Sequence, residues 1–403
     1  MTVVELAEDR MQERCLAWLE HRSETELPVL LYSGGPFSED ARYHILASRP
    51  RFLVTGTVGH LRDGSGGRVQ VLEPDGEIRE EAAWEELLPL LRRLGKKPRE
   101  HGSPFHCGFL GYIGYDLAWV FEYGLPRYLA PSSALPDLWL GWYEEPVVLD
   151  RRSGQLSGAR HPVREILDAP SPTEPEAAEV IEDAGVFHRE EYEAAVERVR
   201  EHCYRGDLFQ ADLSRRITLR VSGSSVDLFG RLLRKSPSPF SAYVGLGDGR
   251  AVVSSSPEEF FRVRGRRLRS RPIKGTRPRG RDPVDDERLR MELLSSEKDL
   301  AELTMIVDLV RNDLGRVARP GSVQVREFPV LLTLPQVFHL FGTVEAELDE
   351  GRDAWDLLAA SFPPGSVSGA PKPKSVEILE IVERSRRGVY TGAIGYLEPG
   401  GNS

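Results

Sequence analysis

The spacing of apolar residues predicts short strands and one helix in the first third of the chain. Residues 27–32 form an apolar run closed by the turn residues 33–36, which is typical of a buried strand entering a turn. Residues 43–47 and 52–55 continue with strand-like composition, and residues 84–94 have the spacing of an amphipathic helix. Strands and helices are therefore mixed from the start of the chain.

Two segments that follow are unusual in composition. Residues 107–122 alternate glycines with large aromatic and aliphatic residues, which favours tight packing in a core over a binding loop. Residues 150–185 are poor in apolar residues and contain Pro162, Pro170, Pro172 and Pro175 among acids. This second segment is interpreted as a crossover or linker.

The second half of the chain predicts further strands and helices. Residues 187–204 have helical periodicity that stops at Gly206, and a second helix is expected over 228–234. Strands are expected at 217–221, 241–244, 251–254 and 336–344. A loop rich in proline and glycine at 361–374 leads into an amphipathic helix whose free N-H groups suit a carboxylate or phosphate, although a long capping loop has the same composition.

One long helix over residues 285–316 carries two acids near its apolar stripe. At about 100° per residue, Leu303, Val307 and Val310 fall on one side. Asp299 lies inside that stripe and Glu302 at its edge. Carboxylates there are costly unless they are paired or bound to a cation, so a metal site and a salt bridge to an arginine both remain open.

The segment Arg-Pro-Ile-Lys-Gly-Thr at 271–276 holds a lysine between residues that restrict or permit particular backbone shapes. Pro272 fixes its own φ, and Gly275 permits close approaches that a Cβ would forbid. Lys274 is therefore expected to be held and partly desolvated, which favours a nucleophilic amine. The other interpretation is a surface lysine at the end of a hairpin.

Two more polar residues stand at strand positions. Glu258 follows the predicted strand 251–254 in a Ser-Pro-Glu sequence and could also be an ordinary turn residue. His339 shares a strand face with Val337 and Phe341, where an isolated histidine is more often a satisfied core residue than a catalyst.

Composition restricts the class of protein. The 403 residues carry 53 basic and 63 acidic side chains and a formal net charge of -10, which argues against nucleic acid as a partner. Three distant cysteines suggest neither a disulfide framework nor a zinc site. Without an apolar leader or a run of about 18 apolar residues, no membrane insertion or export is expected, and a cytoplasmic protein of one large domain or two is predicted.

Taken together, these motifs in this order resemble the chorismate-utilising enzymes, and most closely the branch that forms 4-amino-4-deoxychorismate for para-aminobenzoate and folate. The resemblance runs from residue 31 onward and is densest from Gly206 to the C-terminus. Lys274 is the discriminating residue, because the anthranilate synthase branch typically has alanine there. The resemblance implies chorismate, ammonia, Mg²⁺ and a partner glutaminase subunit, component II, that supplies the ammonia.

The resemblance also implies roles for single residues. Lys274 attacks C2 of chorismate and displaces the C4 hydroxyl, Glu258 is the general acid/base, and His339 is an active-site histidine. Glu302 is a magnesium ligand, with Asp299 as a second acid near the ion. Implied substrate-binding residues are Gly275, Thr276, Ser366 and Tyr390, and an implied pocket for L-tryptophan consists of Ser33, Ala41, Arg42, Tyr43, His44, Pro239, Phe240 and Ser241.

The implied fold is α/β (α+β), with two face-to-face antiparallel β-sheets flanked by helices and two interleaved lobes. The ranges expected for these are 1–170 for the tryptophan-pocket lobe and 186–403 for the chorismate-binding catalytic domain. The family continues beyond the position of Ser403 with strands that complete the site, so a truncated catalytic domain is expected. Anthranilate synthase, isochorismate synthase and a non-catalytic binding remnant remain alternative interpretations.

Overall fold

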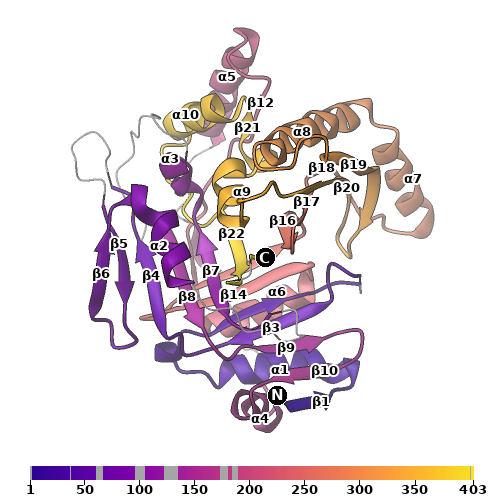
Figure 1. Cartoon of the computed structure of the whole chain (residues 1–403). Coiled ribbons are helices and arrows are strands. Elements are labelled where there is room, and N and C mark those ends of the chain that lie inside the picture. Colours follow the sequence, from indigo (N-terminus) through magenta and orange to yellow (C-terminus); the bar gives the residue numbers. More distant parts are fainter. Residues whose placement is uncertain are drawn as a thin grey trace.

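The computed structural model describes residues 2–36, 38–59, 67–95, 105–121, 135–172, 180–183, 189–399 and 401–403. In this part of the chain the strands form three large sheets and two small two-stranded ones, with helices on the outer faces and between the sheets (Figure 1). Every strand pair described is antiparallel.

The seven-stranded sheet combines the first strands of the chain with two strands from its middle. In spatial order it consists of β1 (Thr2–Glu5), β10 (Gln155–Gly158), β9 (Val147–Asp150), β3 (Tyr43–Ala47), β2 (Val29–Tyr32), β14 (Phe240–Gly247) and β15 (Arg250–Ser256). Its outer face is covered by α1 (Glu8–Glu20), α4 (Arg160–Asp168) and α6 (Ser225–Lys235). Buried side chains such as Trp18, Ile166 and Phe229 form this layer.

A six-stranded sheet packs against the inner face of the first. Its order is β22 (Ala393–Leu397), β7 (Gly108–Ile113), β8 (Leu138–Tyr143), β4 (Phe52–Gly56), β5 (Val69–Leu72) and β6 (Ile78–Ala82). Ile45 and Val148 of one sheet meet Trp139 of the other in a shared apolar cluster. Gly111 has φ 149°, and a Cβ there would lie 2.0 Å from the Trp139 carbonyl oxygen, so the glycine permits the close approach of β7 and β8.

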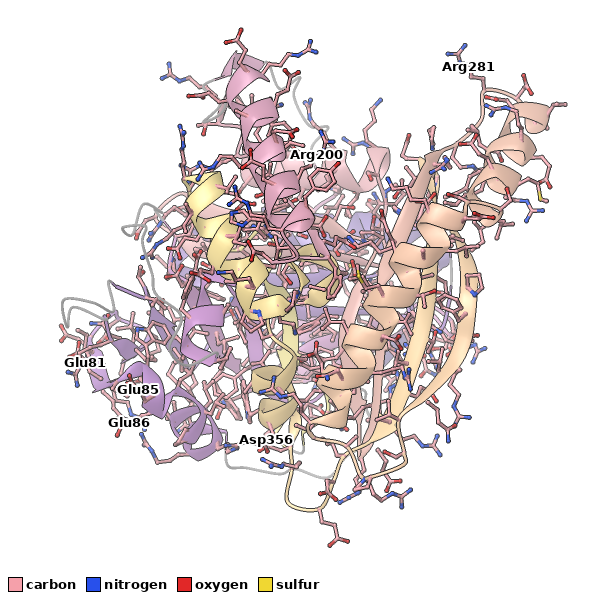
Figure 2. All side chains as sticks on the ribbon, turned by 90° about the horizontal axis from the view of Figure 1, so that it is seen from above. Glu81, Glu85, Glu86, Arg200, Arg281 and Asp356 are labelled. Carbon is pink, nitrogen blue, oxygen red and sulfur yellow. The ribbon has the colours of Figure 1, made fainter. Side chains whose placement is uncertain are left out.

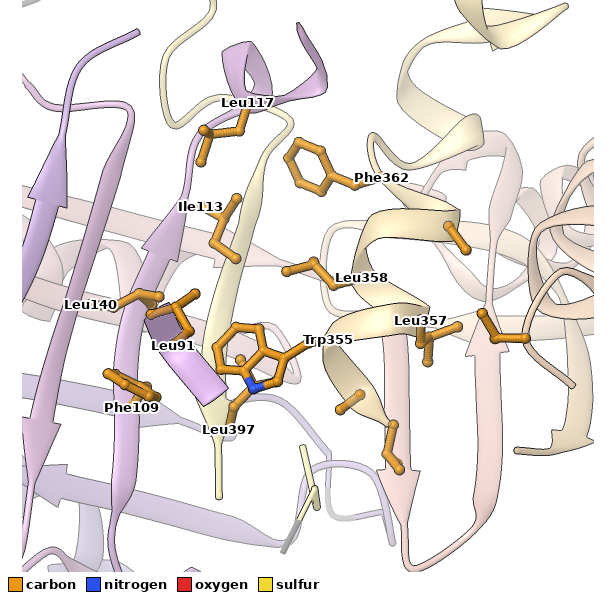
Figure 3. Packing of buried hydrophobic residues seen from close by; sticks show 14 of the residues in the cluster. Leu91, Phe109, Ile113, Leu117, Leu140, Trp355, Leu357, Leu358, Phe362 and Leu397 are labelled. Carbon is orange, nitrogen blue, oxygen red and sulfur yellow. The ribbon is translucent and has the colours of Figure 1, made fainter. Parts of the chain in front are cut away.

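The other face of the six-stranded sheet is covered by helices. These are α2 (Leu87–Leu94) and α9 (Ala354–Ser361), with Trp355 and Leu358 pointing toward Phe109 and Ile113 of β7 (Figure 3). The ring centroids of Phe109 and Trp355 are 5.8 Å apart in an edge-on arrangement. The same cluster continues into the third sheet, so one core joins the two parts of the molecule.

The third sheet holds the lysine motif. Its path is β16 (Glu259–Arg264), β17 (Arg267–Arg271), β20 (Val337–Glu347) and β18 (Ile273–Pro278), with β19 (Gln324–Thr333) on the other edge of β20. Helices α7 (Pro283–Leu294) and α8 (Glu297–Gly315) lie on it, and α8 buries Leu303 and Val307 there.

The remaining elements are short or lie at one end of the molecule. They are α3 (Ala118–Phe121), α5 (Arg189–Tyr204), α10 (Lys372–Glu383), the pairs β11 (Val180–Asp183) with β13 (Leu219–Val221) and β12 (Gln210–Ala211) with β21 (Gly369–Ala370), and the 3-10 turns η1 (Glu24–Glu26), η2 (Trp84–Glu86), η3 (Tyr115–Leu117) and η4 (Gly365–Val367).

The architecture confirms the predicted fold class and corrects two local predictions. Residues 155–168, assigned to a linker, form β10 and α4 in the first sheet and its helical layer, while 173–179 and 184–188 lie outside the described residues. The helix predicted over 285–316 is two helices, because Ser296 caps α8 by accepting a hydrogen bond from the Asp299 N-H. The interleaving is visible in the sheets, since β14 and β22 lie beside strands from the first 150 residues.

Many charged side chains lie at the periphery of these layers. Figure 2 shows Glu81 of β6, Arg200 of α5 and Arg281 before α7 projecting away from the ribbon. Among the described residues, no helix combines the length and the apolar character needed to cross a membrane.

Candidate functional site

A cavity of about 760 Å³ opens where the two large sheets meet the third one. Its wall is built from β2, β14 and β15, from β7 and β22, and from the segment between β15 and β16. The predicted site residues in the wall are Ser33, Tyr43, Pro239, Phe240, Ser241, Glu258, Ser366 and Tyr390. The cavity therefore joins part of the predicted tryptophan pocket to part of the predicted catalytic site.

Glu258 lies at the junction of β15 and β16, with its carboxyl enclosed although the residue as a whole is only half-buried. Its Oε1 accepts a hydrogen bond from Ser366 Oγ at 2.5 Å and a longer one from the Ile273 N-H at 3.4 Å. Burial raises the pKa of Glu258 to about 7, against the opposing effect of both donors and of the Lys274 charge. A carboxyl with such a pKa can give or take a proton near neutral pH.

Lys274 stands on β18 beside a bulge in the pairing with β20. The bulge falls at Gly275, which has φ 83°, and a Cβ there would lie 3.0 Å from Asp299 Cβ. The Lys274 side chain is 13% exposed, and its Nζ donates a hydrogen bond to Asp212 Oδ2 at 2.8 Å. The expectation that this lysine is held and mostly enclosed is confirmed.

His339 lies on β20 directly opposite Thr276 of β18. Its Nδ1 is 3.0 Å from Thr276 Oγ1, and burial lowers its pKa below the ordinary value against a backbone hydrogen bond with Gly275. His339 is half-buried, whereas its neighbours Phe338 and Leu340 form the core face. The histidine therefore contacts the lysine segment. The predicted catalytic, substrate-binding and metal residues that lie outside the cavity wall are Lys274, Gly275, Thr276, Asp299, Glu302 and His339.

The two acids of α8 differ in their surroundings. Asp299 accepts a hydrogen bond from Arg277 at 3.1 Å, which is the salt bridge that the sequence left open. Glu302 is 35% exposed and has only a 3.7 Å ion pair with Lys298. Within the described part of the chain, no three His, Cys, Asp or Glu side chains come together as a metal-binding group.

The surroundings of Glu302 are compatible with a magnesium site that has few protein ligands. Mg²⁺ in substrate complexes is commonly held by one or two carboxylates, with substrate oxygens and water completing the octahedron. The carboxylate of Glu302 fits that role, whereas Asp299 is already engaged by a guanidinium.

Three of the eight residues assigned to the tryptophan pocket lie away from the cavity wall. Ala41 is buried, and Arg42 forms a bidentate ion pair with Asp150 at 2.7 and 3.0 Å. His44 stacks on Tyr32 with ring centroids 4.1 Å apart and accepts a hydrogen bond from the Ser33 N-H. Burial lowers the pKa of His44 to about 3, so this ring is neutral.

The sequence reasoning missed a charged cluster at the rim of the cavity. Asp40 accepts hydrogen bonds from Arg269 and Arg271, and lies 3.5 Å from Arg262. Burial would raise the pKa of Asp40, but the three guanidinium groups hold it below its usual value. The buried Glu259 binds Arg269 and Arg262 as well, so the cluster ties the segment before β3 to the β16–β17 hairpin.

Two further partners were missed because they are distant in sequence. Asp212 contacts Lys274 across 62 positions, and the buried Lys372 Nζ donates to Asp313 and to the Ser361 carbonyl, both at 2.7 Å. Asp313 and Ser361 lie with Glu258 and Ser366 around a small second cavity.

Comparison with known proteins places the chain among enzymes that act on chorismate. Residues 44–403 match the family model described as chorismate binding enzyme. Aminodeoxychorismate synthase component 1 of Klebsiella aerogenes is 39% identical over 383 residues, covering 93% of this chain and 82% of the relative. Anthranilate synthase component 1 of Methanothermobacter thermautotrophicus is 36% identical over 387 residues, covering 94% and 80%.

A solved structure supports the same family assignment as these two relatives. Anthranilate synthase component I from Streptococcus pneumoniae TIGR4 superimposes with a TM-score of 0.75 at 28% identity, covering 91% of this chain and 83% of that one. Relatives of two specificities are thus similarly close, and overall identity does not separate them.

Proposed function

We propose that this chain, which belongs to the family of chorismate-binding enzymes, forms 4-amino-4-deoxychorismate from chorismate and ammonia. The observation that carries the proposal is the enclosed Lys274, whose neighbour Ile273 donates its N-H to Glu258. A nucleophile and an acid with a pKa near 7 are thereby fixed on adjoining segments of backbone.

The proposed reaction uses these two groups in turn. The Lys274 amine forms a bond to C2 of the ring, both ring double bonds shift by one position, and the C4–O bond breaks as Glu258 protonates the departing hydroxyl to give water. Ammonia then bonds to C4 and gives a proton back to Glu258, the two double bonds shift back, and the C2–N bond to Lys274 breaks. Chorismate and ammonia are consumed, and 4-amino-4-deoxychorismate and water are formed.

In the proposal, other residues bind the substrate or orient the reacting groups. Ser366 holds the Glu258 carboxyl in place, and His339 contacts Thr276 of the lysine segment from the β20 side. A magnesium ion would supply positive charge for the ring carboxylate of the substrate, and Glu302 is the residue that would hold it. Ammonia would come from glutamine on a partner glutaminase subunit.

The part of the cavity lined by Ser33, Tyr43 and Phe240 supports a second ligand in the proposal. These residues offer apolar walls and a hydroxyl, which suit an aromatic amino acid such as L-tryptophan. Binding measured by calorimetry with L-tryptophan, and its absence in Phe240→Ala, would support this assignment.

Product identification tests the main proposal. The protein is incubated with chorismate, Mg²⁺ and an ammonium salt, and products are separated by mass spectrometry. We expect 4-amino-4-deoxychorismate. Anthranilate would indicate amination at C2, isochorismate would indicate transfer of water, and recovery of bound but unchanged chorismate would indicate a binding protein; each of these outcomes overturns the proposal.

A further inference from the structure

Asp212 is fixed by its backbone to the loop that carries Ser366. It directly follows β12, and β12 pairs with β21. The Asp212 N-H donates to the Ser368 carbonyl at 2.9 Å, and the Asp212 carbonyl accepts from the Arg387 guanidinium. Arg387 also donates to the Val367 carbonyl at 2.7 Å, so one guanidinium joins the segment after β12 to η4, which precedes β21.

The Asp212 side chain reaches the end of Lys274. Its Oδ2 accepts the hydrogen bond from Lys274 Nζ at 2.8 Å, which is the shortest contact described for that ammonium. Asp212 is 41% exposed, whereas the Lys274 side chain is 13% exposed. The carboxylate thus lies between an enclosed amine and solvent.

A lysine needs such a partner because its side chain has four freely rotating bonds. Holding it in one geometry costs rotamer freedom. Because Asp212 is anchored through its own N-H and carbonyl, the carboxylate is a fixed point for the ammonium. Because the Asp212 carboxylate is 41% exposed, solvent screens this ion pair and it adds little to the free energy of unfolding. Removing the carboxylate is therefore expected to change the position of the amine more than the stability of the fold.

We infer that Asp212 is a positioning residue for Lys274: its carboxylate holds the amine in one orientation and accepts the proton that the ammonium must lose. This inference rests on the proposed function. In the first step an N–H bond of the ammonium breaks and its proton passes to Asp212 Oδ2, while the freed electron pair forms the bond to C2. The C4–O electron pair leaves with the proton of Glu258 as water, so charge and atoms balance.

The electrostatics of the neighbouring acid agree with this geometry. The Asp212 charge acts to raise the pKa of Glu258, and the Lys274 charge acts to lower it, both after the larger effect of burial. The charges of Asp212 and Lys274 therefore both act on Glu258, although Asp212 lies on a different element from Glu258 and Lys274.

The test compares Asp212→Asn and Asp212→Glu with the parent protein. The matched control is Asp207→Asn, since Asp207 lies five positions away, is bound to His202 and has no contact with Lys274. With chorismate, Mg²⁺ and ammonium salt, we expect Asp212→Asn to lower kcat roughly 10- to 100-fold with KM changed less than about twofold. Asp212→Glu should recover part of kcat, and Asp207→Asn should leave it unchanged.

A second measurement does not depend on the reaction. The rate at which acetic anhydride labels Lys274 is followed by peptide mass spectrometry in the substrate-free protein. We expect faster labelling in Asp212→Asn, because the amine is released from its partner, and the parent rate in Asp207→Asn. An unchanged labelling rate in Asp212→Asn overturns the inference whatever product the enzyme makes, and so does an unchanged kcat.

The two measurements separate the two proposals. If the parent protein makes anthranilate or no product while Asp212→Asn still accelerates labelling of Lys274, the proposed reaction fails and the positioning contact stands. If the 4-amino product forms and Asp212→Asn equals the parent in both assays, the reaction stands and the role of Asp212 fails.

Discussion

Replacing Ser366 with alanine removes the closest hydrogen-bond donor to Glu258, the proposed general acid. Ser366 Oγ lies 2.5 Å from Glu258 Oε1, whereas the remaining donor, the Ile273 N-H, is 3.4 Å away. A donor favours the charged carboxylate, so its loss should raise the pKa of Glu258 beyond the value of about 7 that burial produces.

The size of the shift follows from the strength of that bond. A hydrogen bond to a charged group contributes about 1.5 to 3 kcal/mol, and each pKa unit corresponds to about 1.36 kcal/mol. The pKa of Glu258 should therefore rise by about one to two units. Because the proposed step needs the protonated acid, the alkaline limb of kcat/KM should move upward by the same amount.

The assay is the pH dependence of kcat/KM for chorismate, with rates expressed per free ammonia because the neutral fraction of ammonia rises with pH. The parent limb is expected near pH 7 and that of Ser366→Ala near pH 8 to 9. Ser295→Ala is the control, since Ser295 donates only to backbone carbonyls of α7. A limb that stays in place or moves to lower pH would refute the assignment of Glu258 as the acid.

Three other outcomes are expected. Lys274→Ala should lower formation of the 4-amino product roughly 100-fold or more and shift residual amination to C2. Intact-mass analysis of the parent protein with chorismate alone should show an adduct at Lys274. Absence of the adduct, together with parent activity in Lys274→Ala, would exclude covalent catalysis. Glu302→Ala should raise the Mg²⁺ concentration needed for half-maximal activity and lower turnover. Asp308→Ala, on an exposed part of the same helix, should change neither quantity. Equal Mg²⁺ dependence in the two variants would exclude Glu302 as a magnesium ligand. His44 has a depressed pKa of about 3, so its contribution to the free energy of unfolding is complete above about pH 6.5. As pH falls from there toward 3, this contribution decreases by about 1.4 kcal/mol per pH unit. Urea titrations of His44→Gln at several pH values should lack that decrease.

Local patterns predicted many elements because the residues that decide them are close in sequence. The alternation around His339 placed Val337, His339 and Phe341 on one face of the strand, but it did not show that the opposite face, with Phe338 and Leu340, is the one buried in the core. The break between α7 and α8 was missed because it depends on local contacts, with Ser295 Oγ donating to backbone carbonyls at the end of α7 and Ser296 capping the start of α8. Helix α4 was missed because it buries two side chains, Val163 and Ile166, which gives a weak apolar pattern.

The site was predictable as separate motifs but not as an arrangement. Glu258 and Ser366 were each recognised, whereas their contact spans 108 positions and depends on how the third sheet meets η4. Asp212 offered no pattern of its own, since its role arises only when β12 pairs with β21. Contacts of this kind follow from tertiary topology, which periodicity does not encode.

The interleaved sheets have a consequence for synthesis on the ribosome. Strand β2 pairs on one side with β14, which is encoded about 200 residues later. At about 5 to 20 residues per second, the nascent chain carries β2 with that edge unpaired for roughly 10 to 40 s. The apolar edge of Val29–Tyr32 is then open to other strands, so recovery of folded protein should depend on chaperones that cover it until Phe240–Gly247 has left the exit tunnel.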